Sequence, residues 1–296
     1  MIDAGKLLRA FAALVMIGAA GIASAKAHST RHNPYQHDPY RRSAAAYAVV
    51  VDGDLLWDHN LDMHRAPASL TKLLTALVLL DSDWQPDAIL TTSHDAAHTT
   101  PSRVGLHTGD RIRAEDALTA MLMHSANDAC LVLVEHASGT LSAFAARMNA
   151  RAAQLGMHDS HFVHPCGYDA AGQYSTAHDL LRLAQAAHAD PRIARIVAQR
   201  RASITTESGR RLTFGSTNRL LGMPGIVGLK TGYTAQAGRC LIALGERSGH
   251  RVWVVLLGAR QRWWIAPRML SAGFAAANRL TAARSLRAHA HIVAGT

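Results

Sequence analysis

The sequence predicts an α+β fold in which one five-stranded antiparallel sheet packs beside a mainly helical region. Short apolar runs typical of strands occur over residues 44–58 and three more times over residues 225–260. Between them, over about residues 69–200, apolar side chains recur at helical spacing. Because a sheet must bury a face against another layer, we expect the two ends to pair and the helices to pack beside them.

The chain begins with a segment that has the features of a signal peptide. Lys6 and Arg9 precede the apolar stretch FAALVMIGAAGIA, and small residues suited to cleavage surround Ala25. We expect residues 1–27 to be removed and the remaining protein to be exported, to the periplasm or the outer face of the cytoplasmic membrane. The alternative is an uncleaved anchor helix.

The rest of the chain divides into a leader, one domain and a tail. Residues 28–43 are polar, contain proline and lack a period, which predicts a flexible leader. A hairpin at Asp52-Gly53 opens the folded domain, expected over residues 44–280. An amphipathic helix closes that domain, and residues 281–296 form a short basic tail.

The composition of the chain is typical of a globular protein with a positive net charge. Of 296 residues, 49% are hydrophobic and 18% charged, and the formal net charge is +10. This charge predicts attraction to anionic surfaces such as phospholipid headgroups, and so peripheral membrane contact, or to cell-wall polymer. The basic residues are scattered without interleaved aromatic residues, which argues against nucleic-acid binding.

The cysteines and histidines match no metal-binding pattern. Cys130, Cys166 and Cys240 are odd in number, and their spacing fits neither a zinc site nor a redox motif. The apolar surroundings of two of them favour buried free thiols, and one disulfide is the alternative. The 18 histidines include no H-E-x-x-H pattern, so a zinc peptidase is not favoured and no metal or cofactor is expected.

Ser69 and Lys72 form an S-x-x-K pattern at the start of a leucine-rich helix. On a helix that begins at Ser69 the two side chains lie one turn apart and off the apolar stripe. A neutral lysine could take the serine proton, and burial beside another cation lowers a lysine pKa enough for that. When S-x-x-K occurs alone, the serine is more often a helix cap and the lysine a solvated side chain than a catalytic pair.

Two further motifs follow in order. Ser125-Ala126-Asn127 interrupts an apolar helical run and predicts a turn whose polar groups face a cleft. Lys230-Thr231-Gly232 lies on a predicted strand, where an ammonium and a hydroxyl can meet a carboxylate and glycine allows close backbone approach. A second Ser-x-Asn, Ser216 to Asn218, is interpreted as a structural lead into that strand.

Together these motifs resemble the S-x-x-K, S-x-N and K-T-G signature of penicillin-binding proteins and β-lactamases. The surrounding blocks, which include APASLTKLLTALV and GIVGLKTGYTAQAGRCLIA, are similar to those of low-molecular-mass penicillin-binding proteins of the D-alanyl-D-alanine carboxypeptidase family. The resemblance covers about residues 44–275. It implies the fold shared by β-lactamases and penicillin-binding proteins, with the five-stranded antiparallel sheet described above.

The resemblance also implies catalytic roles. Ser69 would attack the carbonyl between two D-alanines at the end of a peptidoglycan stem pentapeptide and form an acyl-enzyme. Lys72 would act as the base, and Ser125 would relay protons. β-lactam antibiotics would acylate the same serine and act as covalent inhibitors.

Substrate-binding roles are implied for a second group of residues. Asn127 would bind the substrate peptide bond, while Lys230, Thr231 and Gly232 would hold the terminal carboxylate. The oxyanion hole would use the backbone N–H groups of the nucleophile and of Tyr233.

Several alternatives remain open at this stage. A D,D-endopeptidase that cuts peptidoglycan crosslinks would use the same residues. A β-lactamase is less favoured, because no E-x-x-L-N stretch lies between Ser125 and Lys230 to activate a deacylating water. A catalytically inactive wall-binding module is a further alternative. The chain is expected to lack the β-rich second domain that many members carry.

Overall fold

The computed structural model describes residues 38–294, and the side chains of residues 38–282 within them. The predicted signal peptide, residues 1–27, lies outside the described residues, as does most of the predicted leader. Residues 38–43 form turns, in which the ring of Tyr40 packs edge-on against that of Trp57, with 5.4 Å between the ring centres.

One five-stranded antiparallel sheet pairs the hairpin at residues 46–59 with the strands of residues 226–259, as predicted. Its strands lie in the order β2-β1-β9-β8-β7. Pairing between β1 and β9 places Val50 opposite Trp253. The strands are β1 (Ala46–Val51), β2 (Asp54–His59), β7 (Ile226–Thr234), β8 (Gly238–Arg247) and β9 (His250–Ala259).

The hairpin between β1 and β2 turns at Asp52 and Gly53. Both residues have positive φ, 52° and 93° respectively. Two such residues form the tight turn whose twist matches that of paired antiparallel strands. The Asp-Gly signal in the sequence therefore located this turn correctly.

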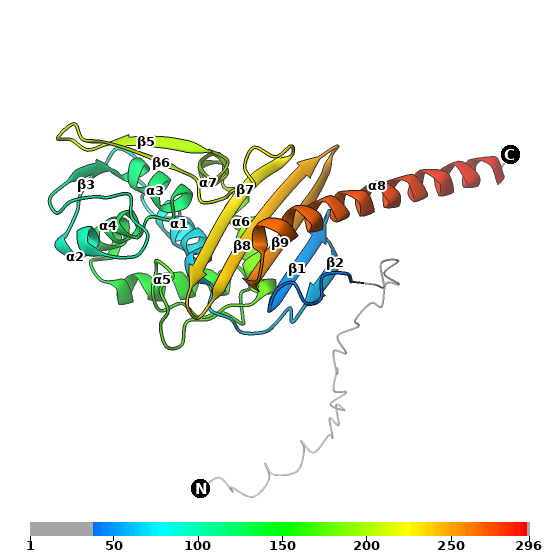
Figure 1. Cartoon of the computed structure of the whole chain (residues 1–296), viewed down its shortest axis with the longest axis horizontal. Coiled ribbons are helices and arrows are strands. Elements are labelled where there is room, and N and C mark those ends of the chain that lie inside the picture. Colours follow the sequence, from blue (N-terminus) through cyan, green and yellow to red (C-terminus); the bar gives the residue numbers. More distant parts are fainter. Residues whose placement is uncertain (1–37, 295–296) are drawn as a thin grey trace, which may run out of the picture. The chain divides into compact units, whose positions relative to one another are not determined.

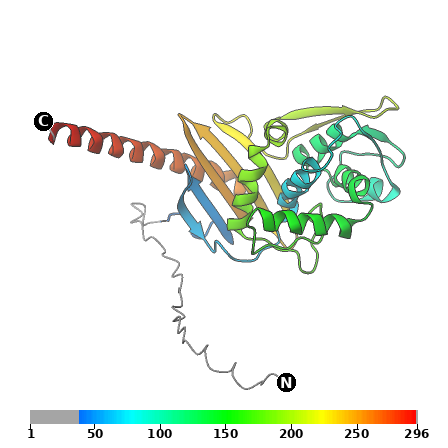
Figure 2. The ribbon, with the colours of Figure 1, turned by 180° about the vertical axis from the view of Figure 1, so that it is seen from behind.

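Alternate side chains of β1 enter two separate cores. Tyr47 and Val49 pack with helix α8 (Arg262–Ala294), whereas Ala48 and Val50 pack with the helical region on the other face. Figure 1 shows α8 crossing one face of the sheet, and Figure 2, seen from the opposite side, shows the helices that cover the other face. This alternation is what a strand with both faces covered requires.

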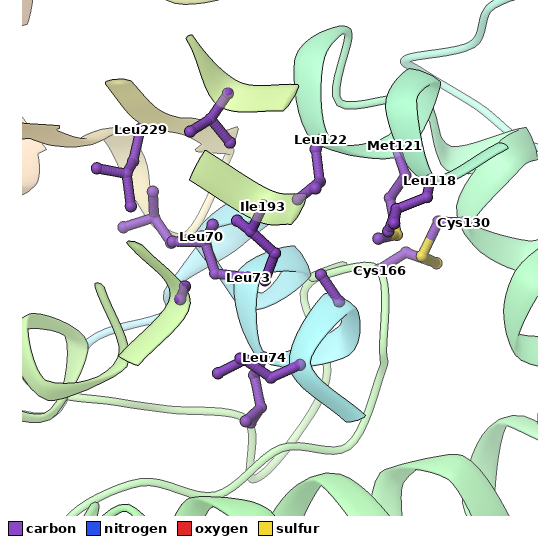
Figure 3. Close-up of a cluster of buried hydrophobic side chains, with 14 of the residues drawn as sticks. Leu70, Leu73, Leu74, Leu118, Met121, Leu122, Cys130, Cys166, Ile193 and Leu229 are labelled. Atoms are coloured by element: carbon purple, nitrogen blue, oxygen red, sulfur yellow. A yellow bond between two sulfur atoms is a disulfide. The ribbon is translucent and has the colours of Figure 1, made fainter. Parts of the chain in front are cut away.

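The helical region surrounds helix α1 (Lys72–Leu80), every residue of which is buried. The predicted single apolar stripe was therefore too narrow, because α1 packs against helices on several sides. Figure 3 shows Leu70, Leu73 and Leu74 pointing in different directions into this core. The other helices are α2 (His94–His98), α3 (Ala114–Met123), α4 (Asn127–Ser138), α5 (Leu141–Gln154), α6 (Ala177–Ala189) and α7 (Pro191–Val197).

Two small hairpin sheets complete the described elements. They pair β3 (Ile89–Thr91) with β4 (Arg111–Arg113), and β5 (Arg201–Thr205) with β6 (Arg211–Gly215). Within residues 38–294, no single helix is long and apolar enough to cross a bilayer; α4 and α5 meet that test only jointly, across a bend of 86°.

Close contact between α8 and the sheet depends on Gly273. A Cβ added there would lie 2.6 Å from Cγ1 of Val252 on β9. Helix propensity alone would make Gly273→Ala stabilising, by about 1 kcal/mol. The contact should reverse that sign, and we expect a net destabilisation of about 1–3 kcal/mol, measured by urea unfolding.

Ser271→Ala, at an exposed position of the same helix, is the matched control and should leave the free energy of unfolding nearly unchanged. A Gly273→Ala protein as stable as the wild type would show that α8 does not depend on this close approach to β9.

Candidate active site

Ser69 lies in a short 3-10 turn, Ala68–Thr71, which leads directly into α1. The α-helix itself begins at Lys72, so the predicted helix start at Ser69 corresponds to this tighter turn. Ala68 has a positive φ of 50°, which is uncommon for a residue other than glycine and occurs often at functional sites. The turn leaves Ser69 partly exposed, while Lys72 behind it is completely buried.

The side-chain nitrogen of Lys72 contacts three oxygen atoms among the described residues. Its Nζ lies 3.1 Å from Ser69 Oγ, 2.7 Å from Asn127 Oδ1 and 2.5 Å from the carbonyl oxygen of Cys166. A protonated ammonium can donate to all three. A neutral amine has two N–H groups and one lone pair. The amide oxygen of Asn127 and the carbonyl oxygen of Cys166 are acceptors only, so each takes one N–H group. The lone pair is then directed at the Ser69 hydroxyl.

The pKa of Lys72 is held well below its ordinary value. The main cause is complete burial, which disfavours the charged form, and the positive charge of Lys230 acts in the same direction. The carboxylate of Asp128 opposes both effects. The neutral amine needed by a general base is therefore accessible at this position.

The turn predicted at Ser125 and Asn127 lies between α3 and α4. Ser125 is buried and has a positive φ of 61°, while Asn127 begins α4 and aims its amide oxygen at Lys72. The backbone N–H of Asn127 donates to the carbonyl of Ser102 at 2.7 Å. Asn127 thus contacts the lysine directly. Ser125 is placed beside it in the chain but is not one of the three contacts of Lys72.

Asp128, the next residue, fixes the loop between α2 and β4. Its carboxylate accepts backbone N–H groups from Val104, Gly105 and Leu106 at 2.9–3.1 Å. Because this side chain is fully buried, these hydrogen bonds supply the partners that a buried carboxylate requires. The start of α4 is thereby held in a defined position next to Lys72.

The Lys230-Thr231-Gly232 motif lies on β7, an edge strand of the sheet. A Cβ added to Gly232 would lie 3.1 Å from the backbone nitrogen of Ser69, so β7 passes directly alongside the turn that carries the serine. Lys230 and Thr231 are both buried. Tyr233 directs an exposed side chain outward, so only its backbone adjoins the motif.

Lys230 is a buried cation with a perturbed pKa. Burial, together with the nearby charge of Arg262, lowers its pKa to about 7. In the described part of the chain, its Nζ donates to the carbonyl of Thr231 at 3.1 Å. An ammonium has three N–H groups, so two remain for a ligand.

Arg262 and Thr217 contribute to the site but were not among the site residues predicted from the sequence. Arg262, at the start of α8, donates from Nη1 to the carbonyls of Gly232 at 2.5 Å and Cys240 at 2.8 Å. Thr217 shares a hydrogen bond of 2.7 Å with the hydroxyl of Thr231. It belongs to the second Ser-x-Asn, which was interpreted only as a lead into the strand.

The preference for free thiols was wrong for two of the three cysteines. Cys130 on α4 and Cys166 form a disulfide with 6.0 Å between their Cα atoms, while Cys240 is free and buried. The apolar residues around a cysteine in the sequence predict that its thiol is buried, but they do not predict which other thiol it contacts. The pairing depends on the chain returning to α4 after 36 residues, which no local pattern shows.

Together, the sheet, the buried central helix and the serine–lysine pair at its start define the class of penicillin-binding-protein folds. A family model for D-alanyl-D-alanine carboxypeptidase matches residues 32–261, and the chain belongs to that family. Among solved structures, the Streptomyces K15 DD-transpeptidase is similar, with a TM-score of 0.74 and 26% identity over 79% of this chain and 97% of that one.

Two curated relatives differ in their described activities. The D-alanyl-D-alanine carboxypeptidase DacF of Bacillus subtilis is 30% identical over 73% of this chain and 57% of its own length. The D-alanyl-D-alanine endopeptidase of Escherichia coli is 34% identical over 73% of this chain and 72% of its own length. The chain thus spans less than two thirds of the carboxypeptidase DacF.

Gly167 provides a test of how the loop after α5 supports the serine. Its φ is 81°, and an added Cβ would lie 2.1 Å from the carbonyl oxygen of Ala68. We expect Gly167→Ala to displace the Ala68–Ser69 segment, to lower the thermal midpoint and to abolish most labelling of Ser69 by a fluorescent penicillin.

Gly172→Ala is the matched control, since Gly172 has the same φ and lies in the same loop, but its added Cβ meets nothing nearer than 3.9 Å. This control should show only the backbone strain of a left-handed alanine, about 1 kcal/mol, and normal labelling. Equal labelling of the two variants would contradict the proposed support of Ser69 by the loop.

Proposed function

We propose that this protein is a serine-type D-alanyl-D-alanine carboxypeptidase that removes the terminal D-alanine from peptidoglycan stem pentapeptides. The observation that carries the proposal is the fully buried Lys72, whose Nζ lies 3.1 Å from Ser69 Oγ and is held by two oxygens that can only accept. This arrangement supplies a nucleophile and an oriented base with no metal or cofactor.

Ser69 is proposed as the nucleophile and Lys72 as its base. The Ser69 oxygen forms a bond to the carbonyl carbon between the two D-alanines while its proton moves to Lys72 Nζ. The backbone N–H groups of Ser69 and Tyr233 stabilise the oxyanion. The C–N bond then breaks, and Lys72, with Ser125 as relay, returns the proton to the leaving amine. Water hydrolyses the acyl-enzyme in a second step.

Lys230 is proposed to recognise the terminal carboxylate of the substrate, together with Thr231 and Gly232. A buried ammonium whose described partner is one carbonyl is poorly compensated, and a carboxylate ligand would supply the missing negative charge. Gly232 allows the substrate backbone to approach the strand, and Asn127 would bind the substrate amide.

The domain boundaries and location follow as further parts of the proposal. Residues 44–280 would form the peptidase domain, preceded by a signal peptide and leader and followed by a basic tail. The mature protein would act outside the cytoplasm, where its substrate and β-lactam inhibitors are present. The positive charge would favour peripheral contact with anionic surfaces.

A crosslink-cutting D,D-endopeptidase is the second candidate. It is supported by the endopeptidase of Escherichia coli, which is 34% identical and which this chain matches over 72% of that protein's length. Both reactions break a bond after a D-alanine carbonyl and use the same acyl-enzyme. They differ in whether the leaving amine is free D-alanine or a crosslinked stem peptide.

Digestion of purified muropeptides separates the two activities. We expect the protein to remove one alanine from pentapeptide monomers, read by mass spectrometry, and expect Ser69→Ala to be inactive because it lacks the nucleophile. Conversion of crosslinked dimers to monomers, with pentapeptides left intact, would instead establish the endopeptidase. No change in either substrate would contradict both assignments.

The low pKa of Lys230 predicts a fall in activity on the alkaline side. Since its charged form binds the carboxylate, kcat/KM for pentapeptide should fall as the pH rises through about 7, where Lys230 loses its proton. Arginine stays protonated throughout this range. Lys230→Arg should therefore move the alkaline limb to higher pH, even if the larger side chain lowers the maximum rate. If the alkaline limb of the Lys230→Arg variant stays at the same pH, the loss of activity at high pH is caused by another titrating group.

A further inference from the structure

We propose that the Cys130–Cys166 disulfide is a positioning device for Lys72, because it ties together the two oxygen acceptors that aim the lysine at Ser69. The inference rests on the proposed function, in which Lys72 is the base. It assigns a catalytic consequence to a bridge whose sulfur atoms themselves touch no substrate.

One end of the bridge carries an acceptor itself, and the other end lies one helical turn from the second acceptor. Cys166 supplies its own backbone carbonyl, which lies 2.5 Å from Lys72 Nζ. Cys130 lies three residues after Asn127 on α4, so the two share one helical face, and Asn127 Oδ1 lies 2.7 Å from the same nitrogen. Figure 3 shows the bridge running from α4 to the loop beside α1.

The disulfide adds to the few noncovalent contacts that hold the Cys166 loop close to Lys72. Residues 155–176, between α5 and α6, contain no helix or extended strand. Near Lys72 the loop is held by Thr75, whose hydroxyl donates to the carbonyl of Pro165 at 2.6 Å, and by a bond within the loop from Cys166 N to His164 Nδ1. The disulfide adds a covalent connection to α4, which restricts how far the Cys166 carbonyl can move.

Both forms of the lysine depend on that carbonyl. In the neutral amine, the carbonyl and the Asn127 amide oxygen occupy the two N–H groups, which leaves the lone pair facing Ser69. Without the carbonyl, one N–H is released and the lone pair is no longer fixed. In the ammonium form, loss of an acceptor removes stabilisation of the positive charge, so the pKa of Lys72 should fall further.

These two effects give a signature that simple unfolding does not produce. The maximum acylation rate should fall, while the acidic limb of the pH profile should move to lower pH. Among the side chains that the structure describes, the other charged or titratable groups that face Lys72 are Lys230 on β7, Asp128 on α4 and His164 on the loop. None of these three is changed chemically by opening the bridge, but reduction adds the thiols of Cys130 and Cys166, which the double alanine variant described below does not have. A loss of folded protein would lower the acylation rate equally at every pH and would not move the acidic limb of the pH profile.

The experiment compares acylation by a fluorescent penicillin in the oxidised and the reduced mature protein across a range of pH. Dithiothreitol gives two electrons and two protons to the sulfurs, which become two thiols, and it closes to its own cyclic disulfide. Alkylation and mass spectrometry establish which state is present. The double variant Cys130→Ala/Cys166→Ala keeps the position 166 carbonyl and supplies an open form if the buried bridge resists the reductant.

We expect acylation of the reduced protein and of the double variant to be slower by about tenfold, with the acidic limb at lower pH. The double variant should not respond to the reductant. Cys240→Ala, which removes the free thiol and leaves the bridge, should behave like the wild type in both states. Circular dichroism on each sample measures the folded fraction.

Two results would overturn the inference while the proposed function stands. One is that the acylation rate and the position of the acidic limb are unchanged in the reduced protein and in the double variant. The other is a fall in rate that matches the loss of folded protein, with the limb in place, which would make the bridge purely structural. If the oxidised wild type is not acylated at all, the proposed function fails and the inference fails with it.

Discussion

The burial of an amine at the start of the central helix is the constraint on which the rest of the site depends. An uncompensated charge in an apolar core costs several kcal/mol, so Lys72 must either lose its proton or find acceptors on every side. It has both: a lowered pKa and three oxygen partners. Those partners come from the preceding turn, from α4 and from the loop after α5. Three segments distant in sequence are therefore organised around one nitrogen atom.

The two buried lysines have different environments and hence different proposed tasks. The pKa of Lys72 is lowered most by burial and then by the charge of Lys230, which favours the neutral amine. The pKa of Lys230 is lowered to about 7, so near neutral pH a substantial fraction keeps its charge. Lys72 has Ser69 and two acceptor oxygens around its nitrogen, whereas Lys230 lies on the strand beside the serine, so two groups of one chemical type are proposed as base and as anion-binding group in the same site.

Much of the fold and the motif positions followed from local sequence, whereas the links between segments did not. Alternating apolar strands, the Asp-Gly turn and helical spacing are local patterns, and they predicted the five-stranded sheet. The full burial of α1, the partnership of Thr217 with Thr231 and the contact of Arg262 with Gly232 depend on distant segments. The Cys166 carbonyl could not be predicted at all, because every residue has one and only the folded loop directs it at Lys72.

The free third cysteine explains how an odd number of thiols is compatible with one specific bridge. Disulfide exchange requires a thiolate that can reach a sulfur atom of the bridge. Cys240 is buried within β8, and this burial raises the pKa of its thiol to about 11, so almost none is ionised near neutral pH. Cys130 and Cys166 are themselves buried. Burial thus protects the bridge beside Lys72 from exchange with the third thiol, just as burial of the lysine lowers its own pKa.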